Sequence, residues 1–280
     1  MADDFTLGLV CSRGADPAQG GRKHNEDNYL ICQDGLIRYR QGQTEKVLRK
    51  PGHGLLMAVA DGMGGHRHGE LASSAAVQAL CRLYYRKAPR DPESALHAFL
   101  VRGHRKLREK AVTRQMGDIG TTLATCWIID HWLYWAHVGD SRIYLLRGET
   151  ITQLTRDHTR GEFARRDGRA SPMKPKSLAQ NFLFGSRGLG SDDDIRIDAG
   201  TDTGSQTLFV GDHLLLCSDG LSNFVPSHRI ARAVWDAENP AACAQWLVDR
   251  AIAAGSDDNI TVMILRVERS PHEPDMLTVW

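Results

Sequence analysis

Residues 55–70 read L-L-M-A-V-A-D-G-M-G-G-H-R-H-G-E, and the interpretation of the whole chain starts from them. The first six residues are apolar, which is the pattern of a buried strand. The strand ends at Asp61, and an unpaired carboxylate is costly to bury. A metal ion would neutralise Asp61, and the glycines that follow would let backbone carbonyls approach the same ion. A glycine-rich turn with Asp61 as a helix N-cap explains the stretch equally well, so the other strand ends have to decide.

Length and composition indicate an ordinary globular protein. The chain has 280 residues, of which 41% are hydrophobic and 25% charged, and its net charge is +1. So small a charge gives no overall field that would attract nucleic acid or a membrane surface, and we expect neither as a partner. No run approaches the ~20 apolar residues that cross a bilayer. The acidic start, residues 1–4, is unlike a secretory signal peptide.

The six cysteines are scattered along the chain and include no C-x-x-C pair, so they suggest neither a zinc site nor a redox motif. Several lie inside apolar runs, as reduced and buried thiols do. This usage predicts a cytoplasmic location.

Hydrophobic periodicity predicts an alternation of strands and helices. Strands are expected at residues 5–12, 28–32, 55–60, 122–129, 132–138, 143–146, 151–154, 208–217 and 260–267. Helices are expected over 72–84, from Asp91-Pro92, from Ser227 and from Asn239-Pro240. The four segments between 122 and 154 are spaced like an antiparallel meander, and residues 33–53 like an exposed hairpin or excursion.

Residues 155–200 have no such periodicity and are rich in Lys and Arg. A long loop of this kind inside a compact domain is usually functional or mobile. No repeat and no linker divides the chain. We therefore expect one domain over residues 1–268, followed by a loosely held tail at 269–280.

Acidic residues recur where apolar strands begin or end: Glu26, Asp27, Asp61, Asp219 and Asp258, with Asp140 in a tight turn. Any one of them is more often a turn former than a ligand. Gathered at one edge, they would repel one another unless cations bound there. Oxygen ligands favour Mg²⁺ or Mn²⁺. Two such ions ~3.5–4 Å apart would turn a bridging water into a nucleophile for phosphorus, and Arg22 could grip the phosphate.

Seven short motifs follow one another along the chain: R-K-H-N-E-D (22–27), V-A-D-G-M-G-G-H-R-H-G-E (59–70), G-T-T-L-A (120–124), H-V-G-D-S-R-I-Y (137–144), L-T-R-D-H-T (154–159), C-S-D-G-L (217–221) and D-D-N-I-T-V (257–262). In this order the set resembles the metal-dependent serine/threonine protein phosphatases of type 2C (PPM family), especially the bacterial single-domain members. Each motif alone is weak, whereas the ordered set is very specific.

The resemblance implies an α+β fold, a four-layer αββα sandwich of two antiparallel β-sheets flanked by helices. It implies two Mn²⁺ or Mg²⁺ ions, and a third as in bacterial relatives, held by Asp61, Gly62, Asp140, Asp219 and Asp258. Arg22 would bind the substrate phosphate, and Glu26 and Asp27 would act mostly through metal-bound waters. Asn259 would orient Asp258 from behind.

Two departures from the family pattern stand out. Met63 occupies the place where eukaryotic relatives have a histidine that is proposed to protonate the leaving oxygen. His66 or His68 could replace it, both could be exposed loop residues, or a metal-bound water could be the acid. The family's flap corresponds to about 155–190, where the divergent basic middle is either a surface for acidic or phosphorylated partners or a solvated loop.

These observations lead to one preferred function and two alternatives. The preferred function is hydrolysis of phosphoserine and phosphothreonine in proteins by a hydroxide that bridges two ions, opposing a serine/threonine kinase, in a monomer. The first alternative is a catalytically silent phosphoprotein-binding scaffold of the same fold, which the presence of Asp61, Asp219 and Asp258 disfavours. The second, nucleotide binding by the glycine-rich loop 62–69, lacks the G-K-[S/T] that should follow.

Overall fold

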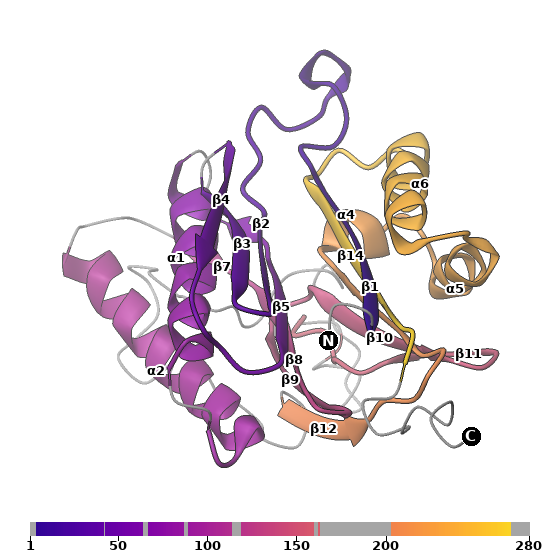
Figure 1. Cartoon of the computed structure of the whole chain (residues 1–280). Helices are drawn as coiled ribbons and strands as arrows, with labels where there is room; N and C mark the ends of the chain where they lie inside the picture. The colour runs from indigo at the N-terminus through magenta and orange to yellow at the C-terminus, as the bar shows by residue number, and fades with distance from the viewer. Residues whose placement is uncertain are drawn as a thin grey trace, which may run out of the picture.

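The computed structural model describes residues 4–41, 43–63, 67–86, 89–113, 119–159, 162 and 203–269. Two large antiparallel sheets face each other, and helices cover the outer side of each (Figure 1). The predicted α+β class and the four-layer αββα arrangement are confirmed.

The larger sheet is covered by the two long helices α1 (Arg67–Tyr84) and α2 (Pro92–Thr113). In spatial order its strands are β12 (Thr203–Thr207), β9 (Trp132–Val138), β8 (Leu123–Ile129), β5 (Leu55–Ala60), β2 (Asn28–Gln33), β3 (Leu36–Gln41) and β4 (Thr44–Arg49). Asp91 caps α2 as predicted, because its Oδ1 accepts a hydrogen bond of 3.1 Å from the Ser94 amide. The hairpin expected within residues 33–53 is β3–β4.

The smaller sheet packs against α5 (Ser227–Asp236) and α6 (Pro240–Ala253) on its outer side. Its strands, in spatial order, are β1 (Phe5–Ser12), β14 (Ile260–Val267), β13 (His213–Cys217), β10 (Arg142–Arg147) and β11 (Thr150–Gln153). Short elements complete the fold: the 3₁₀ helix η1 (Pro17–Gln19), the helix α4 (Asp219–Ser222) and the two-residue pair β6 (Gly62–Met63) and β7 (Gly120–Thr121).

Strand β5 shows why its sequence is continuously apolar. Its alternate residues Leu55, Met57 and Val59 belong to the core between the two sheets. The intervening Leu56, Ala58 and Ala60 belong to the core under α1 and α2. A strand buried on both faces has no position for a polar side chain until it ends, and it ends at Asp61.

The structure corrects the predicted meander over residues 122–154. Strands β8 and β9 pair in the larger sheet, whereas β10 and β11 pair in the smaller one. The chain crosses between the sheets at Gly139, whose φ of 105° suits glycine. Spacing along the sequence could not show this crossing, because both hairpins have the alternation of a meander.

The predicted strand over 208–217 is correct only for residues 213–217. Before it, the Asp212 carboxylate accepts a hydrogen bond of 2.8 Å from the Phe209 amide, and Gly211 has a φ of 86°, so the chain turns. Strand β12 was not predicted, because its sequence T-G-S-Q-T lacks an apolar alternation. It lies at the edge of the larger sheet.

Most of the predicted flap and tail lie outside the described residues. Residues 155–159 and 162 of the flap are described, and of the tail only Arg269. Within the described ranges no helix is long and apolar enough to cross a membrane. A single domain with a flap and a tail remains a prediction.

Candidate metal centre and active site

The strand register brings acidic residues from distant parts of the chain to one end of the sandwich. In the larger sheet Asn28 pairs with Ala60, so Asp27 and Asp61, the adjacent residues, lie at the ends of neighbouring strands. In the smaller sheet Cys217 pairs with Val262, which places Asp219 and Asp258 just beyond the same end of β13 and β14. Each sheet therefore contributes carboxylates to a common site.

Asp27 is fully buried between the two sheets, and its two oxygens have different surroundings. Oδ2 accepts hydrogen bonds from Thr261 Oγ1 at 2.7 Å and Ser218 Oγ at 2.8 Å. Oδ1 has no hydrogen-bond partner among the described residues. Burial, opposed by the two hydroxyl groups, raises the pKa of Asp27 to about 7. A buried carboxylate with one unused oxygen suits a cation or a water bound to one.

The backbone of Asp61 is fixed by the two threonines of G-T-T-L-A. Thr122 Oγ1 accepts from the Asp61 amide at 3.0 Å, and Thr122 N and Thr121 Oγ1 donate to the Asp61 carbonyl at 2.8 and 2.9 Å. Burial raises the pKa of the Asp61 carboxyl well above its usual range. Four nearby carboxylates raise it further: Asp27, Asp219, Asp258 and Asp140. The five carboxylates are therefore near enough to affect one another. When they are ionised they repel one another, and bound cations would relieve this repulsion.

Gly62 and Gly69 allow the chain to approach Glu26 closely. A Cβ at Gly62 would fall 2.3 Å from the Gly69 carbonyl oxygen, and a Cβ at Gly69 would fall 2.4 Å from Glu26 Oε2. Ser73 Oγ on α1 donates to the Glu26 carbonyl at 2.5 Å. Burial raises the pKa of Glu26 to about 7. The glycines of the 59–70 motif are thus needed for close packing beside this carboxylate.

Asn259 holds the loop that carries the R-K-H-N-E-D motif. Its Oδ1 accepts from the Glu26 amide at 2.8 Å, and its Nδ2 donates to the carbonyls of Arg13 at 2.9 Å and His24 at 3.0 Å. The expected orientation of Asp258 comes from the Asn259 backbone instead, whose amide donates to Asp258 Oδ1 at 2.8 Å. The Asn259 side chain therefore organises the loop beside the site.

Arg22 lies at the rim of the site beside Asp258. Its Nη2 is 2.8 Å from Asp258 Oδ2, and the two side chains are 57% and 29% exposed. A guanidinium in this position remains accessible to an anion arriving from solvent. Its planar fork suits two oxygens of a phosphate.

Asp140 and Asp219 extend the acidic region toward the start of the predicted flap. Burial raises the pKa of Asp140 to about 7, with Asp219 and Asp157 as the neighbouring charges. The Ser141 and Thr122 hydroxyls lie 2.6 Å apart, which connects the Asp140 turn to the threonines around Asp61. Asp219 is the first residue of α4, and its Oδ2 accepts from Asn223 at 2.8 Å.

Residues 154–159 support the Asp140 turn. The His158 amide donates to the Gly139 carbonyl at 2.8 Å, and the Gly139 amide donates to His158 Nδ1 at 3.2 Å. Arg142 holds Asp157 in a two-point contact of 2.9 and 2.6 Å. The start of the predicted flap is therefore tied to the Asp140 turn.

Within the described ranges, no three or more His, Cys, Asp or Glu side chains could hold an ion by themselves. The implied ligand set has four carboxylates, Asp61, Asp140, Asp219 and Asp258, and the described side chains are not gathered closely enough to hold an ion without further ligands. The Gly62 carbonyl and waters would have to complete the coordination. All of these donors are oxygens, which suit Mg²⁺ or Mn²⁺. The residues present thus fit the expected ions, with water completing the coordination.

The residue at the position of the family's proposed general acid cannot donate a proton. Met63 lies in β6 and has no proton to give. His66 and the side chain of His68 are outside the described part of the chain. Sequence reasoning singled out the carboxylates but missed the hydroxyls and glycines that hold them: Gly69, Ser73, Thr121, Thr122, Ser218 and Thr261. Most stand inside the quoted motifs, which was the available signal.

Comparison with known proteins identifies the family of this chain. A family model described as Protein phosphatase 2C matches residues 21–250. The Streptococcus pneumoniae "Protein phosphatase PhpP" is 33% identical over 221 residues, which cover 78% of this chain and 88% of the relative. The Listeria welshimeri "Serine/threonine phosphatase stp" is 30% identical over 261 residues, 89% of this chain and 92% of the relative.

A solved structure of similar fold contains metal. The catalytic domain of the serine/threonine protein phosphatase PstP, in complex with two manganese ions, superposes with a TM-score of 0.72 at 27% identity. The match covers 95% of this chain and 99% of that one. The likeness therefore extends over the whole fold described above.

Proposed function

Because the chain belongs to the protein phosphatase 2C family, we propose that it hydrolyses phosphoserine and phosphothreonine in proteins with the help of two Mn²⁺ or Mg²⁺ ions. The observation that carries this proposal is the buried Asp27, with one oxygen unused, among the other carboxylates of the site. The two manganese ions in the PstP structure support the choice of metal.

We assign the ions to Asp61, the Gly62 carbonyl, Asp219 and Asp258, with Asp140 beside Asp219. When bound, they supply Lewis acidity that brings the pKa of a water into the range where it can attack phosphorus. Glu26 and Asp27 accept hydrogen bonds from waters of the site. The carboxylates are preorganised by the threonine, serine and glycine contacts, which makes the site ready before substrate arrives.

Arg22 binds the substrate phosphate. It is exposed at the rim and within reach of Asp258, so it can hold an anion directly above the acidic region. The arriving phosphate and Asp258 then compete for its guanidinium. Binding energy from Arg22 orients the phosphorus toward the attacking water.

The thiol at the end of β13, just before the acidic site in the sequence, is not suited to act as a nucleophile. Cys217, the cysteine closest in sequence to Asp219, is fully buried. Burial raises its pKa to about 12, so it stays protonated and is a poor nucleophile. We therefore propose direct attack by water with no covalent phosphoenzyme.

The central test replaces Asp61 or Asp219 by Ala. Each variant should lose hydrolysis of a phosphothreonine peptide at every manganese concentration. Calorimetric titration with Mn²⁺ should show weakened binding while circular dichroism stays unchanged. Activity like that of the unchanged protein in either variant would reject the proposed ligand set.

A second test replaces Arg22 by Ala. Loss of the phosphate contact should raise KM about tenfold or more, since a charge-assisted hydrogen bond contributes about 1.5–3 kcal/mol, and should change kcat less. The matched control is Arg49→Ala, which replaces an exposed arginine on β4. An unchanged KM would remove Arg22 from the substrate site.

The remaining assignments concern the setting of the enzyme. We propose phosphorylated proteins as substrates, a serine/threonine kinase as the opposing enzyme, a monomer, and a cytoplasmic location. The six cysteines, which form no disulfide, support a reducing compartment.

A further inference from the structure

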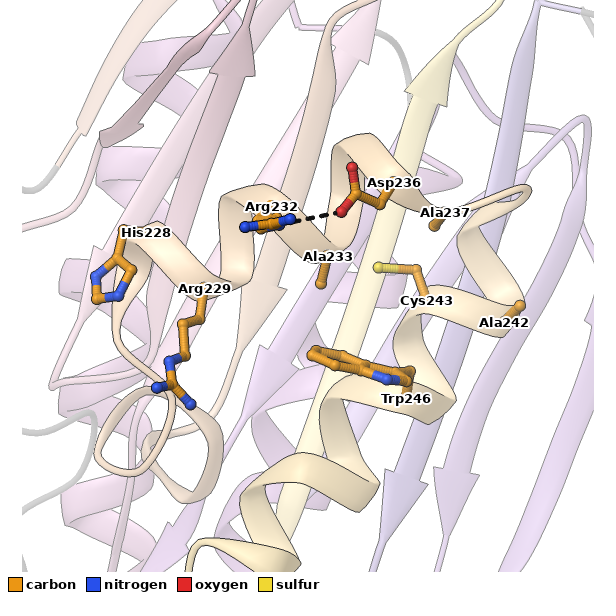
Figure 2. A pocket seen from close by; sticks show the side chains of 9 residues that line it. All are labelled: His228, Arg229, Arg232, Ala233, Asp236, Ala237, Ala242, Cys243 and Trp246. Carbon is orange, nitrogen blue, oxygen red and sulfur yellow. Dashed lines mark hydrogen bonds and ion pairs between the residues drawn. The ribbon is translucent and has the colours of Figure 1, made fainter.

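A hollow of about 700 Å³ lies between α5 and α6 on the outer side of the smaller sheet. Figure 2 shows the side chains that line it, with the Trp246 indole from α6 in the space between the two helices. Its apolar floor is formed by Ala233, Ala237, Ala242, Cys243 and Trp246. Trp246 is 47% exposed, whereas Cys243, one turn earlier on the same helix, is buried at the floor. The exposed part of the indole and the apolar floor beside it together form a contact surface that is open to solvent.

The rim of this hollow is basic. Arg229 and Arg232 of α5 line it, and the Arg250 guanidinium lies over the Trp246 ring at 5.6 Å. Among the lining residues Asp236 is the one carboxylate, and it pairs with Arg232 at 3.3 Å. The lining therefore holds two guanidinium groups against one carboxylate, and the Arg250 guanidinium lies beside it on the Trp246 ring.

We propose that the α5–α6 hollow docks an acidic segment of phosphoprotein substrates, in which an apolar or aromatic side chain stands between carboxylates. The apolar side chain packs on Trp246 and the floor, while the flanking carboxylates meet the arginines. Trp and Arg are the residue types that carry most binding energy at protein interfaces. This inference rests on the proposed phosphatase function, because that function makes phosphoproteins the visiting partners.

The short chain segment between Asp219 and His228 limits how far the carboxylate site can lie from the His228 end of the hollow. His228, which lines the hollow, follows Asp219 by nine residues, so the two are at most ~30 Å apart even along a fully extended chain. A flexible linker of about twelve residues spans ~20 Å on average and more when stretched. A docking segment joined to the phosphorylated residue by such a linker would raise the local concentration of that residue at the carboxylate site.

The test compares three phosphothreonine peptides. The first is short, the second carries a flexible linker of about twelve residues and the segment Glu-Glu-Leu-Trp-Glu-Glu, and the third has lysines in place of the glutamates. With manganese, the acidic peptide should have a kcat/KM on the order of tenfold higher than the short one. The lysine peptide should show no gain.

Variants of the hollow should remove this gain and leave basal turnover intact. We expect the double variant Arg229→Ala/Arg232→Ala, and separately Trp246→Ala, to hydrolyse the acidic peptide no faster than the short one. The short peptide and p-nitrophenyl phosphate should be hydrolysed as before. Arg49→Ala on the exposed β4 is the matched control and should keep the gain. No gain in the unchanged enzyme, or an undiminished gain in the double variant, would overturn the proposal.

Binding without turnover separates this inference from the proposed function. Fluorescence anisotropy of the labelled acidic segment, without phosphate, should show binding that both variants lose. If binding holds while no peptide is hydrolysed, the phosphatase function fails and the docking site stands. If the segment binds only after residues 270–280 are removed, the chain's own C-terminal segment is the occupant and the proposal is overturned. A dimer that Trp246→Ala dissociates would assign the hollow to a second copy and likewise overturn it.

Discussion

Thr261 and Ser218 are the residues that hold the Asp27 carboxylate. Both donate to Oδ2 and leave Oδ1 for the ions and their waters. Thr261→Val removes one donor and keeps the shape of the side chain. We expect Mn²⁺ affinity to fall about tenfold, as for other groups that orient a ligand from behind, with Ser218 keeping part of the effect.

Calorimetric titration with Mn²⁺ measures this change directly, and the manganese dependence of activity should shift in parallel. Thr150→Val is the control, because the Thr150 hydroxyl only donates to the Arg147 carbonyl in an exposed turn. Unchanged affinity in Thr261→Val would mean that the hydroxyl serves folding alone.

The raised pKa values of Asp27 and Asp140 predict an unusual pH dependence for the metal-free protein. Both carboxyls stay protonated to about pH 7 when folded, but ionise near pH 4 when unfolded. The folded state therefore binds more protons between these values, so this contribution to stability is full below about pH 4 and is lost as the pH rises through 7. In chelator, the melting temperature should fall by several degrees from pH 5.5 to pH 8.

Excess Mn²⁺ should reverse this trend, since the ions compete with protons for the same oxygens. Differential scanning calorimetry at both pH values, with and without metal, checks the sign. A metal-free protein that grows more stable as the pH rises would show that these carboxyls are not buried as the structure places them.

At the residue scale, the sequence was sufficient for the charged groups and insufficient for their supports. Asp61 and Asp219 could be found because a carboxylate at the end of a buried apolar strand is costly unless a partner neutralises it. Ser218 and Thr261 could not be singled out, because a small hydroxyl residue in a strand has no such cost and reveals its partner only after folding.

Among the elements, the loop before β2 depends on a single side chain at the start of β14. Asn259 makes three hydrogen bonds to it, at Arg13, His24 and Glu26. Asn259→Ala should destabilise the protein by about 2–3 kcal/mol, at roughly 1 kcal/mol per bond. It should also lower kcat, because Glu26 loses its fixed position.

Urea unfolding measures the stability loss, and hydrogen exchange should show faster exchange at the Glu26 amide. Asn223→Ala, which removes one bond to Asp219 in α4, is a useful comparison because the loop is untouched. Native-like exchange at Glu26 in Asn259→Ala would contradict the role given to this side chain.

Elements with strong periodicity could be predicted, and those defined by long-range pairing could not. The sequences of α2 and α6 have apolar residues at helical spacing and an N-cap residue, and that of β5 is continuously apolar. Strand β12 is polar and becomes a strand only because β9 offers it an edge. Strands β9 and β10 belong to different sheets, and the sequence between them, which includes Gly139 with its φ of 105°, does not show this crossing.

For the whole molecule, ion binding should stabilise the sandwich. A ligand that binds only the folded state adds RT ln(1 + [L]/Kd), about 2.7 kcal/mol at a concentration of 100 Kd. Saturating Mn²⁺ should therefore raise the melting temperature by roughly 5 °C or more over the same sample in EDTA. The Asp61→Ala variant should lose most of this increase.

Calcium provides a further comparison, since it prefers more and longer oxygen contacts than Mn²⁺, and we expect it to raise the melting temperature less. Equal stabilisation of the unchanged protein and Asp61→Ala by Mn²⁺ would place the ions elsewhere.

For the whole molecule, the ordered motifs were sufficient to predict the architecture, because their resemblance covers nearly the whole chain. The hollow between α5 and α6 was not predicted, since the docking of two separate helices creates it.

Asp27 precedes a strand of the larger sheet, yet both hydroxyls that hold it belong to the other sheet or its margin. The gap between the layers, filled by Met57, Leu214, Met263 and their neighbours, therefore helps to set how far apart the opposing oxygens stand. Adding or removing a methylene in that interior should change the separation of the carboxylates that the two sheets contribute, because a close-packed core transmits changes of volume. Apolar core side chains would in this way influence whether the site prefers the smaller Mg²⁺ or the larger Mn²⁺.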